Sequence, residues 1–299
     1  MRFLWILAFL AFQANAQGLK GSETVTLRAD AESIHAHLFK PRPKGRGPAI
    51  VLVHGFDGVS ESREGFWARE LAKLGVATLV IESFRNPSRT STAQGVRDAY
   101  AALGYLAAQP YIDPARVGIM GMSRGGSVAL RAADQREHGG GPAFAAAIAL
   151  YPGCVAQYRN PRPDAPIQVL MGGRDDYSPV KRCAEYLERI RRAGGAAELD
   201  VYPEARHGFD GDTTNERVYF FAHAQNLSDC VLYIEDDGST TYARTGEPLE
   251  TPREAREVMR RDCMKTGATL AADARAKAQA LEDVKAFLKK TLLKPRSPT

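Results

Sequence analysis

The sequence predicts an α/β fold with a mostly parallel central sheet and helices on both faces. Apolar runs rich in β-branched residues alternate with segments of helical spacing, the pattern of successive βαβ crossovers. Most of these runs are continuously apolar, which is typical of strands buried on both faces. A chain of 299 residues, 44% of them hydrophobic, is long enough to bury such a core.

The strands and helices follow one another along the first two thirds of the chain. Two extended segments with alternating polarity come first, at 24–29 and 34–41. Apolar runs predict buried strands at 48–55, 76–83, 116–121, 144–152, 167–173 and 197–203. Helical spacing predicts the helices between them, at 63–74, 91–108, 124–137 and 179–193.

The pattern changes after residue 210. We expect a helix at 215–226, a hairpin at 231–243 around Asp237-Gly238, and a charged helix at 252–263. A closing helix at 270–293 should pack on the sheet, because five residues share one face: Leu281, Val284, Phe287, Leu288 and Leu292. We predict that 17–299 forms one domain in which 228–268 is an insertion.

The N-terminus has the pattern of a signal peptide over residues 1–16. Arg2 precedes an apolar run at 3–12, and "ANA" at 14–16 is a cleavage pattern. The run is about half the roughly 20 residues that span a bilayer. We expect cleavage after Ala16, a periplasmic or secreted protein, and no membrane insertion after cleavage.

The net charge and the cysteines indicate which partners, disulfides and metal sites to expect. The net charge is +5 and the basic residues are scattered, so no nucleic-acid partner is expected. Four cysteines, an even number, predict disulfides in an exported chain, with three possible connectivities. Two of them, Cys230 and Cys263, bracket the insertion, which favours their pairing. No Cys-x-x-Cys pair occurs, so no metal site is expected. The sequence does not indicate an oligomeric state.

The stretch "GIMGMSRGG" at 118–126 contains Gly121, Ser123 and Gly125 in a Gly-x-Ser-x-Gly pattern. It follows the strand at 116–121 and opens a helix, which is the setting of a nucleophile elbow. The alternative is a glycine turn that is only structural. A phosphate-binding loop is disfavoured because the Gly-Lys-Ser/Thr ending is missing and the Gly-x-Gly-x-x-Gly pattern is incomplete. We therefore predict that Ser123 is a nucleophile.

A serine nucleophile needs a base and an acid that orients the base. Asp175 follows the strand at 167–173, whereas Asp176 is more consistent with capping the next helix or facing solvent. His207 follows the strand at 197–203. The chain order Ser123, Asp175, His207 is the expected one for this chemistry. The other histidines considered are His35 and His37 on an early strand, His54 in a loop, His138 in a Gly-rich surface loop, and His223 on a helix.

The loop "LVHGFDG" at 52–58 follows the first buried strand and fits an oxyanion-hole loop. Its backbone would supply one donor at Phe56, and the N–H of Arg124 would supply the other. His54 is expected to brace the loop rather than act as the base.

Together these stretches resemble the dienelactone hydrolase family of α/β-hydrolases: "LVHGFDG", "IESFR", "GIMGMSRGGSVAL", "YPGC", "GGRDDYSPVKRC" and "YPEARHGFD". The resemblance implies a compact α/β-hydrolase with a triad of Ser123, Asp175 and His207 and without a metal or cofactor. It also supports a disulfide between Cys154 and Cys183. The enzymes that name the family use a cysteine nucleophile, whereas this chain has Ser123.

The predicted activity is hydrolysis of carboxylic esters or lactones of small substrates. The connection at 152–166 is short and contains four prolines, which leaves no room for a large lid. The insertion could still lean over the site. Two other functions are consistent with the sequence: a small peptidase or acyl-peptide hydrolase, and a non-catalytic binding protein on a hydrolase scaffold.

Overall fold

The structure is a computed structural model that describes residues 18–30, 32–41, 45–84 and 91–294. The predicted signal peptide at 1–16 lies outside the described residues, as does the arginine of the "IESFR" stretch.

The core of the fold is an eight-stranded sheet in the order β1-β2-β4-β3-β5-β6-β8-β9. Its strands are β1 (Glu23–Ala29), β2 (Glu32–Phe39), β3 (Gly47–Val53), β4 (Ala77–Ile81), β5 (Ile112–Met122), β6 (Ala147–Leu150), β8 (Ile167–Gly172) and β9 (Ala197–Tyr202). Strand β2 pairs antiparallel with β1 and β4, and every pair from β4 to β9 is parallel. The predicted α/β class with a mostly parallel sheet is confirmed.

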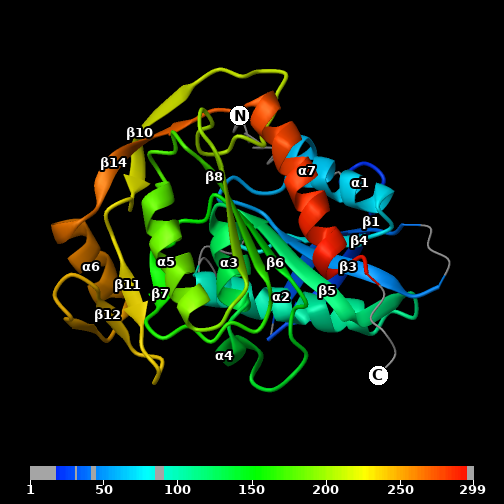
Figure 1. Ribbon diagram of the computed structural model, residues 1–299, viewed down its shortest axis with the longest axis horizontal. Coiled ribbons are helices and arrows are strands. Elements are labelled where there is room, and N and C mark those ends of the chain that lie inside the picture. The colour runs from blue at the N-terminus through cyan, green and yellow to red at the C-terminus, as the bar shows by residue number, and fades with distance from the viewer. Residues whose placement is uncertain (1–17, 31, 42–44, 85–90, 295–299) are drawn as a thin grey trace, which may run out of the picture.

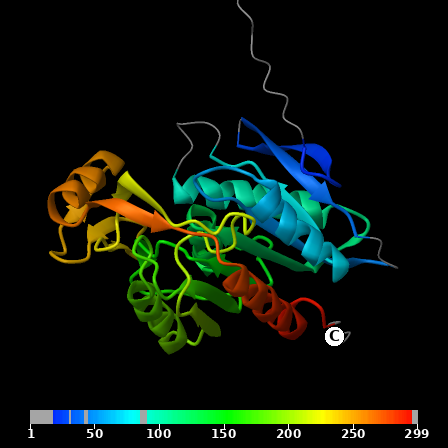
Figure 2. The same cartoon turned by 90° about the horizontal axis from the view of Figure 1, so that it is seen from above.

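Helices cover both faces of this sheet, with α7 and α2 on opposite sides (Figures 1 and 2). The helical elements are the π-helical turn η1 (Glu61–Gly65), α1 (Phe66–Lys73), α2 (Thr92–Ala107), α3 (Arg124–Ala132), α4 (Gln135–His138), α5 (Val180–Arg192), α6 (Pro252–Asp262) and α7 (Ala274–Thr291).

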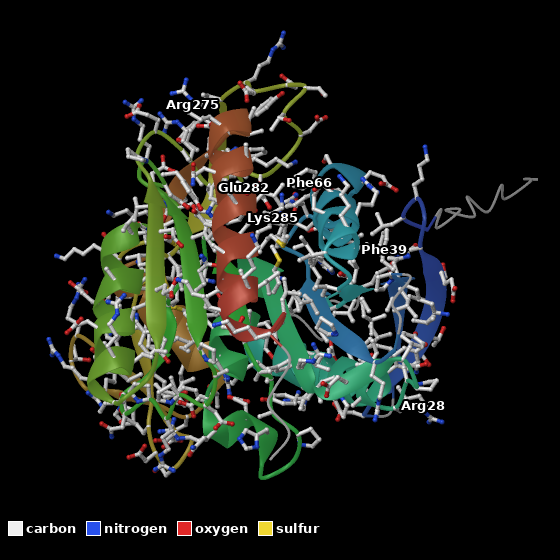
Figure 3. All side chains as sticks on the ribbon, turned by 45° about the vertical axis from the view of Figure 1, so that its right-hand side comes forward. Arg28, Phe39, Phe66, Arg275, Glu282 and Lys285 are labelled. Carbon is white, nitrogen blue, oxygen red and sulfur yellow. A yellow bond between two sulfur atoms is a disulfide. The ribbon has the colours of Figure 1, made fainter. Side chains whose placement is uncertain are left out.

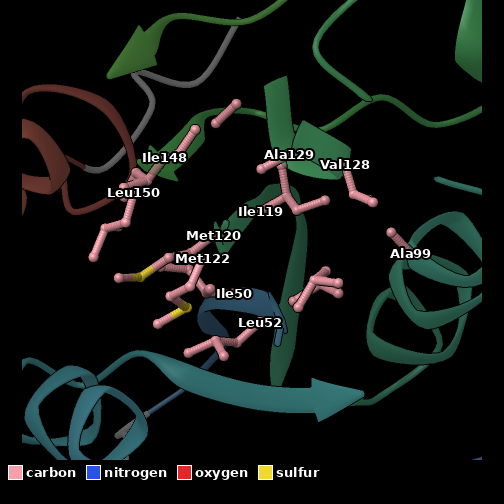
Figure 4. Close-up of a cluster of buried hydrophobic side chains, with 14 of the residues drawn as sticks. Ile50, Leu52, Ala99, Ile119, Met120, Met122, Val128, Ala129, Ile148 and Leu150 are labelled. Carbon is pink, nitrogen blue, oxygen red and sulfur yellow. The ribbon is translucent and has the colours of Figure 1, made fainter. Parts of the chain in front are cut away.

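The strand patterns follow from burial on both faces. All seven residues of β3 are buried, which explains why its sequence is continuously apolar. In Figure 4, Ile50 and Leu52 from β3 lie on the same side of the sheet as Met120 from β5, the register partner of Leu52. Ile119 points to the other side, where Val128 and Ala129 of α3 lie. These central strands therefore form a rigid base whose carboxyl ends can hold a site.

The closing helix α7 packs on the sheet as predicted. Asp273 caps its N-terminus by accepting a hydrogen bond from Ala276 N over 2.9 Å. Val284, Phe287 and Leu288 are buried, whereas the opposite face is charged. Figure 3 shows Arg275 and Glu282 on this helix, and both are exposed.

The single helix predicted at 124–137 is wrong, because it is broken into α3 and α4. Asp134 interrupts the helix with an extended backbone and accepts a hydrogen bond from Arg136 N. An aspartate side chain can itself accept hydrogen bonds from nearby backbone N–H groups. It therefore competes with helical hydrogen bonding and favours the start of a new helix at this position.

The helix predicted at 215–226 is also wrong. Residues Tyr219–Asn226 form strand β10, which pairs antiparallel with β14 (Lys265–Leu270). This segment contains Val218, Phe220 and Phe221, which are strand-forming residues with largely exposed side chains. The β10–β14 ribbon reaches beyond residues 228–268 at both ends.

The predicted hairpin around Asp237-Gly238 is confirmed. Strands β11 (Leu232–Ile234) and β12 (Thr240–Tyr242) form it, and a sheet of order β13-β12-β11-β7 joins it to β13 (Pro248–Leu249) and β7 (Ala156–Tyr158). Because β7 belongs to the connection after β6 and pairs parallel with β11, the insertion is attached to the body through this strand.

Two disulfides hold these parts together. One joins Cys154, after β6, to Cys183 in α5, and the other joins Cys230 to Cys263 across the insertion. Both pairs are those expected from the sequence. Within the described ranges, no helix is long and apolar enough to cross a membrane.

Candidate active site

Ser123 occupies a sharp turn between β5 and α3. Its backbone is in the left-handed region, with φ +52°, which is unusual for a residue other than glycine. The glycines on either side are required by space. A Cβ on Gly121 would lie 2.2 Å from Gly125 O, and a Cβ on Gly125 would lie 2.0 Å from Val53 O. The strained turn thus has the strand-to-helix geometry of a nucleophile elbow.

The structure brings the three predicted residues together. His207 Nε2 lies 2.9 Å from Ser123 Oγ, and His207 Nδ1 lies 2.8 Å from Asp175 Oδ2. A carboxylate only accepts hydrogen bonds, so His207 Nδ1 carries the proton and Nε2 is free to accept the serine proton. The side chains of Asp175 and His207 are 0% and 4% exposed.

The loop after β8 fixes the orientation of Asp175. Its Oδ1 accepts hydrogen bonds from the backbone N–H groups of Tyr177 and Ser178, at 2.9 and 2.6 Å. Asp176 does not cap α5 but is exposed, the second of the two alternatives that its sequence position suggested. Both of its carboxylate oxygens accept hydrogen bonds from Thr269 on β14.

Two aromatic rings confine the His207 imidazole. The rings of Tyr151 and Tyr177 lie edge-on to it, with centroids 4.7 and 5.0 Å away. Tyr151 follows β6 directly, so the carboxyl-end argument used for Asp175 could have found it. We did not predict either tyrosine from the sequence.

The other histidines lie outside the triad. His54 is buried and donates from Nδ1 to Gly55 O over 2.6 Å, as expected of a residue that braces the loop, and burial lowers its pKa. His37 is buried on β2. His138 ends α4 rather than lying in a loop, because α4 extends to it, and His223 is on β10 rather than on a helix.

The predicted oxyanion loop lies against the elbow. A Cβ on Gly55 would be 3.6 Å from Ser123 Cβ. The guanidinium of Arg124 lies over the rings of Phe56 and Phe84, 4.9 and 5.2 Å from their centroids. Burial lowers the pKa of Arg124, and its guanidinium forms no hydrogen bond or ion pair with the described part of the chain.

A pocket of about 350 Å³ adjoins this loop. It is lined by His54, Phe56, Asp57, Gly58, Val59, Glu82, Ser83 and Phe84. A second pocket of about 230 Å³ lies between α5 and the insertion. Neither pocket is lined by a triad residue, and only the first includes the loop that lies against Ser123. No cluster of three or more potential metal ligands occurs among residues whose positions are described.

Comparison with known proteins identifies the family of this chain. A sequence model of the dienelactone hydrolase family matches residues 34–228. A Methylorubrum extorquens protein named putative carboxymethylenebutenolidase is 29% identical over 225 residues, which cover 66% of this chain and 75% of the relative. A Bradyrhizobium protein named probable 2-oxo-3-(5-oxofuran-2-ylidene)propanoate lactonase is 26% identical over 213 residues, 62% of this chain and 82% of the relative.

One solved structure shares the fold of this chain over most of the length of both proteins. It is described as a dienelactone hydrolase-like promiscuous phosphotriesterase from metagenomic libraries. The TM-score is 0.62 with 20% sequence identity, over 90% of this chain and 97% of that chain. The likeness identifies the fold as that of an α/β-hydrolase. With the match over residues 34–228, the chain belongs to the dienelactone hydrolase family of carboxylic ester hydrolases.

Proposed function

We propose that the protein hydrolyses carboxylic esters or lactones of small substrates through a triad of Ser123, Asp175 and His207. The observation that carries the proposal is the continuous pair of hydrogen bonds, 2.9 Å from Ser123 Oγ to His207 Nε2 and 2.8 Å from His207 Nδ1 to Asp175 Oδ2. This arrangement supports nucleophilic catalysis because each group activates or orients the next.

In the first half of the reaction Ser123 Oγ attacks the substrate carbonyl carbon while its proton moves to His207 Nε2. Asp175 stabilises the imidazolium that forms. The tetrahedral intermediate then collapses as His207 returns the proton to the leaving alkoxide oxygen. The products are the free alcohol and an acyl group bound to Ser123; for a lactone, the alcohol remains part of the acyl group.

In the second half a water molecule attacks the acyl carbon and transfers its proton to His207. Collapse of the second intermediate breaks the bond to Ser123 Oγ, which recovers its proton from His207. The carboxylic acid leaves. The proposed reaction requires no metal or cofactor.

The backbone N–H groups of Phe56 and Arg124 are proposed to bind the oxyanion. The approach of Gly55 to Ser123 supports this, because it brings the loop that contains Phe56 against the elbow. Arg124 opens α3, whose N-terminal partial positive charge also favours a developing anion.

Two observations support this substrate class, the first its small size and the second the inclusion of lactones. The pocket beside the loop, about 350 Å³, is near the lower end of the roughly 300–1,000 Å³ usual for ligand sites. The Bradyrhizobium relative is named as a lactonase, which supports including lactones with esters. A panel of nitrophenyl esters of increasing acyl length, several lactones and a few peptides tests the proposal, with Ser123→Ala as the control. We expect hydrolysis of short esters or lactones that Ser123→Ala lacks, whereas Ser123-dependent cleavage of peptides alone would contradict the substrate class.

We also propose that residues 1–16 are removed during export, so that the mature chain of 17–299 works in the periplasm or outside the cell. The disulfides support an oxidising compartment. N-terminal sequencing of the protein recovered from the periplasm or medium should begin at Gln17. Recovery only from the cytoplasm with residues 1–16 intact would contradict export.

A further inference from the structure

The end of β14 contacts both loops that carry the proposed acid and base. Thr269 N and Oγ1 donate to the two carboxylate oxygens of Asp176 over 2.8 and 2.6 Å. The next two residues contact the other loop. Leu270 forms a parallel bridge with His207, and Ala271 N donates to His207 O over 3.2 Å. Three consecutive residues therefore connect the Asp175 loop with the His207 loop.

The other strand of the ribbon holds the same aspartate. Asn226, at the end of β10, is buried, and its Nδ2 donates to Asp176 O over 3.0 Å and to Gly267 O over 2.7 Å. Figure 2 shows the ribbon, with β10 in yellow and β14 in orange, running from α6 across the body toward α7. Asp176 is thus bound through its side chain by β14 and through its backbone by β10.

Asp176 is joined by one peptide bond to Asp175, so a displacement of one moves the other. The Asp175 carboxylate has little tolerance for such movement, because Oδ2 must meet His207 Nδ1 while Oδ1 meets the N–H groups of Tyr177 and Ser178. A misplacement of about 1 Å in a catalytic group can reduce a rate by about a hundredfold.

We infer that Asp176 and Thr269 are positioning residues, which set the Asp175 carboxylate against the His207 imidazole by fastening the acid loop to the β10–β14 ribbon. The inference rests on the proposed function for its effect on turnover, but not for its effect on the hydrogen bond between Asp175 and His207. In this arrangement the β10–β14 ribbon is a structural part of the site, and its removal would loosen both loops.

Three variants test the inference by kinetics. Asp176→Ala removes both side-chain acceptors, and we expect kcat for a short nitrophenyl ester to fall about tenfold or more with KM changed less than about threefold. Asp176→Asn can accept from Thr269 N and donate to Thr269 Oγ1, so it should restore kcat to within about threefold of wild type. Asp229→Ala is the matched control, because Asp229 pairs with Lys265 on the same ribbon and does not contact either loop through its side chain.

A spectroscopic measurement keeps the inference separate from the proposed activity. The His207 Nδ1 proton should give a far-downfield NMR resonance, assigned by its loss in His207→Gln. We expect it to persist in wild type, Asp176→Asn and Asp229→Ala, and to broaden or move upfield in Asp176→Ala. Thr269→Val, which keeps a β-branched strand residue, should show a smaller change of the same sign and serves if Asp176→Ala does not fold.

The inference is overturned if Asp176→Ala and Thr269→Val keep the resonance of Asp229→Ala, or if Asp176→Asn loses it as fully as Asp176→Ala. Failure of the proposed function has a different signature: ester hydrolysis that Ser123→Ala retains, whatever the resonance does.

Discussion

The indole nitrogen of Trp67 in α1 donates a hydrogen bond of 2.8 Å to Oδ2 of Asp210, in the loop that follows His207. The other carboxylate oxygen of Asp210 accepts from the hydroxyl of Tyr151, whose ring packs on His207. All three side chains of this cluster, Trp67, Tyr151 and Asp210, are fully buried. A buried carboxylate therefore fastens the histidine loop to α1 and to the end of β6.

Substitution of Asp210 by alanine should destabilise the protein strongly, because it leaves two buried donors without an acceptor. We expect Asp210→Ala to lower the free energy of unfolding by about 2–4 kcal/mol, measured by urea denaturation. Asp212→Ala is the control, since Asp212 is exposed and, within the described part of the chain, its side chain accepts hydrogen bonds only from Thr214. Equal midpoints for the two variants would contradict the role of the buried carboxylate.

Two glycine-to-alanine substitutions should have different effects, one lowering the activity and the other raising the stability. Gly125→Ala places a methyl group 2.0 Å from Val53 O, so the elbow must distort and esterase activity should fall by about a hundredfold or more. Gly104→Ala, on the exposed face of α2, meets no atom within 4 Å and should raise the stability by about 0.5–1 kcal/mol. Activity assays with thermal unfolding measure both. An active Gly125→Ala variant would show that the tight approach at the elbow is not required.

The contribution of Glu64 to the free energy of unfolding should decrease as the pH rises. Burial raises the pKa of this carboxyl to about 7, from 4.5 as the reference for an exposed glutamate. The folded state therefore favours the protonated form, and its contribution is complete below about pH 4.5 and is lost as the pH rises through about 7.

Glu64→Gln imitates the protonated carboxyl and should remove this dependence. Between pH 4.5 and 7.5 the free energy of unfolding of wild type should fall relative to that of the variant by about 2–3 kcal/mol. Urea denaturation at several pH values measures the difference. A difference that is flat, or that rises with pH, would show that Glu64 is ionised in the folded protein across this range.

The disulfide between Cys154 and Cys183 should contribute to stability rather than to chemistry. It closes a loop with a sequence separation of 29, so replacing both cysteines by serine should cost about 3–4 kcal/mol on the chain-entropy model. Neither cysteine contacts the triad through a hydrogen bond, so kcat well below the melting temperature should stay within about threefold of wild type. Loss of kcat in a variant that is still folded would show that this disulfide is needed for catalysis.

The parts of the site that the sequence predicted are those on the buried parallel strands. Ser123, Asp175 and His207 each follow such a strand, and parallel strands end at the same edge, so residues far apart in the chain could be expected to meet. The two hydrogen bonds bring them together as expected. Their catalytic roles stay predictions until they are measured.

The parts that the sequence did not predict depend on pairing between distant segments. The run before Asn226 has the composition of a strand, but only its pairing with β14 decides between strand and helix. The Asp176–Thr269 contact joins residues 93 positions apart and leaves no local pattern in either segment. The buried Asp210 cluster was missed for the same reason, since nothing near Asp210 in the chain indicates its partners Trp67 and Tyr151.

The most direct test of the central proposal, that Ser123 is the nucleophile, is the site of covalent labelling by a fluorophosphonate. Wild type should gain one adduct by intact-mass measurement, and peptide mapping should assign it to Ser123. His207→Gln should react far more slowly, and Ser123→Ala should not react. An adduct on any other residue, or equal labelling of Ser123→Ala and wild type, would contradict the account.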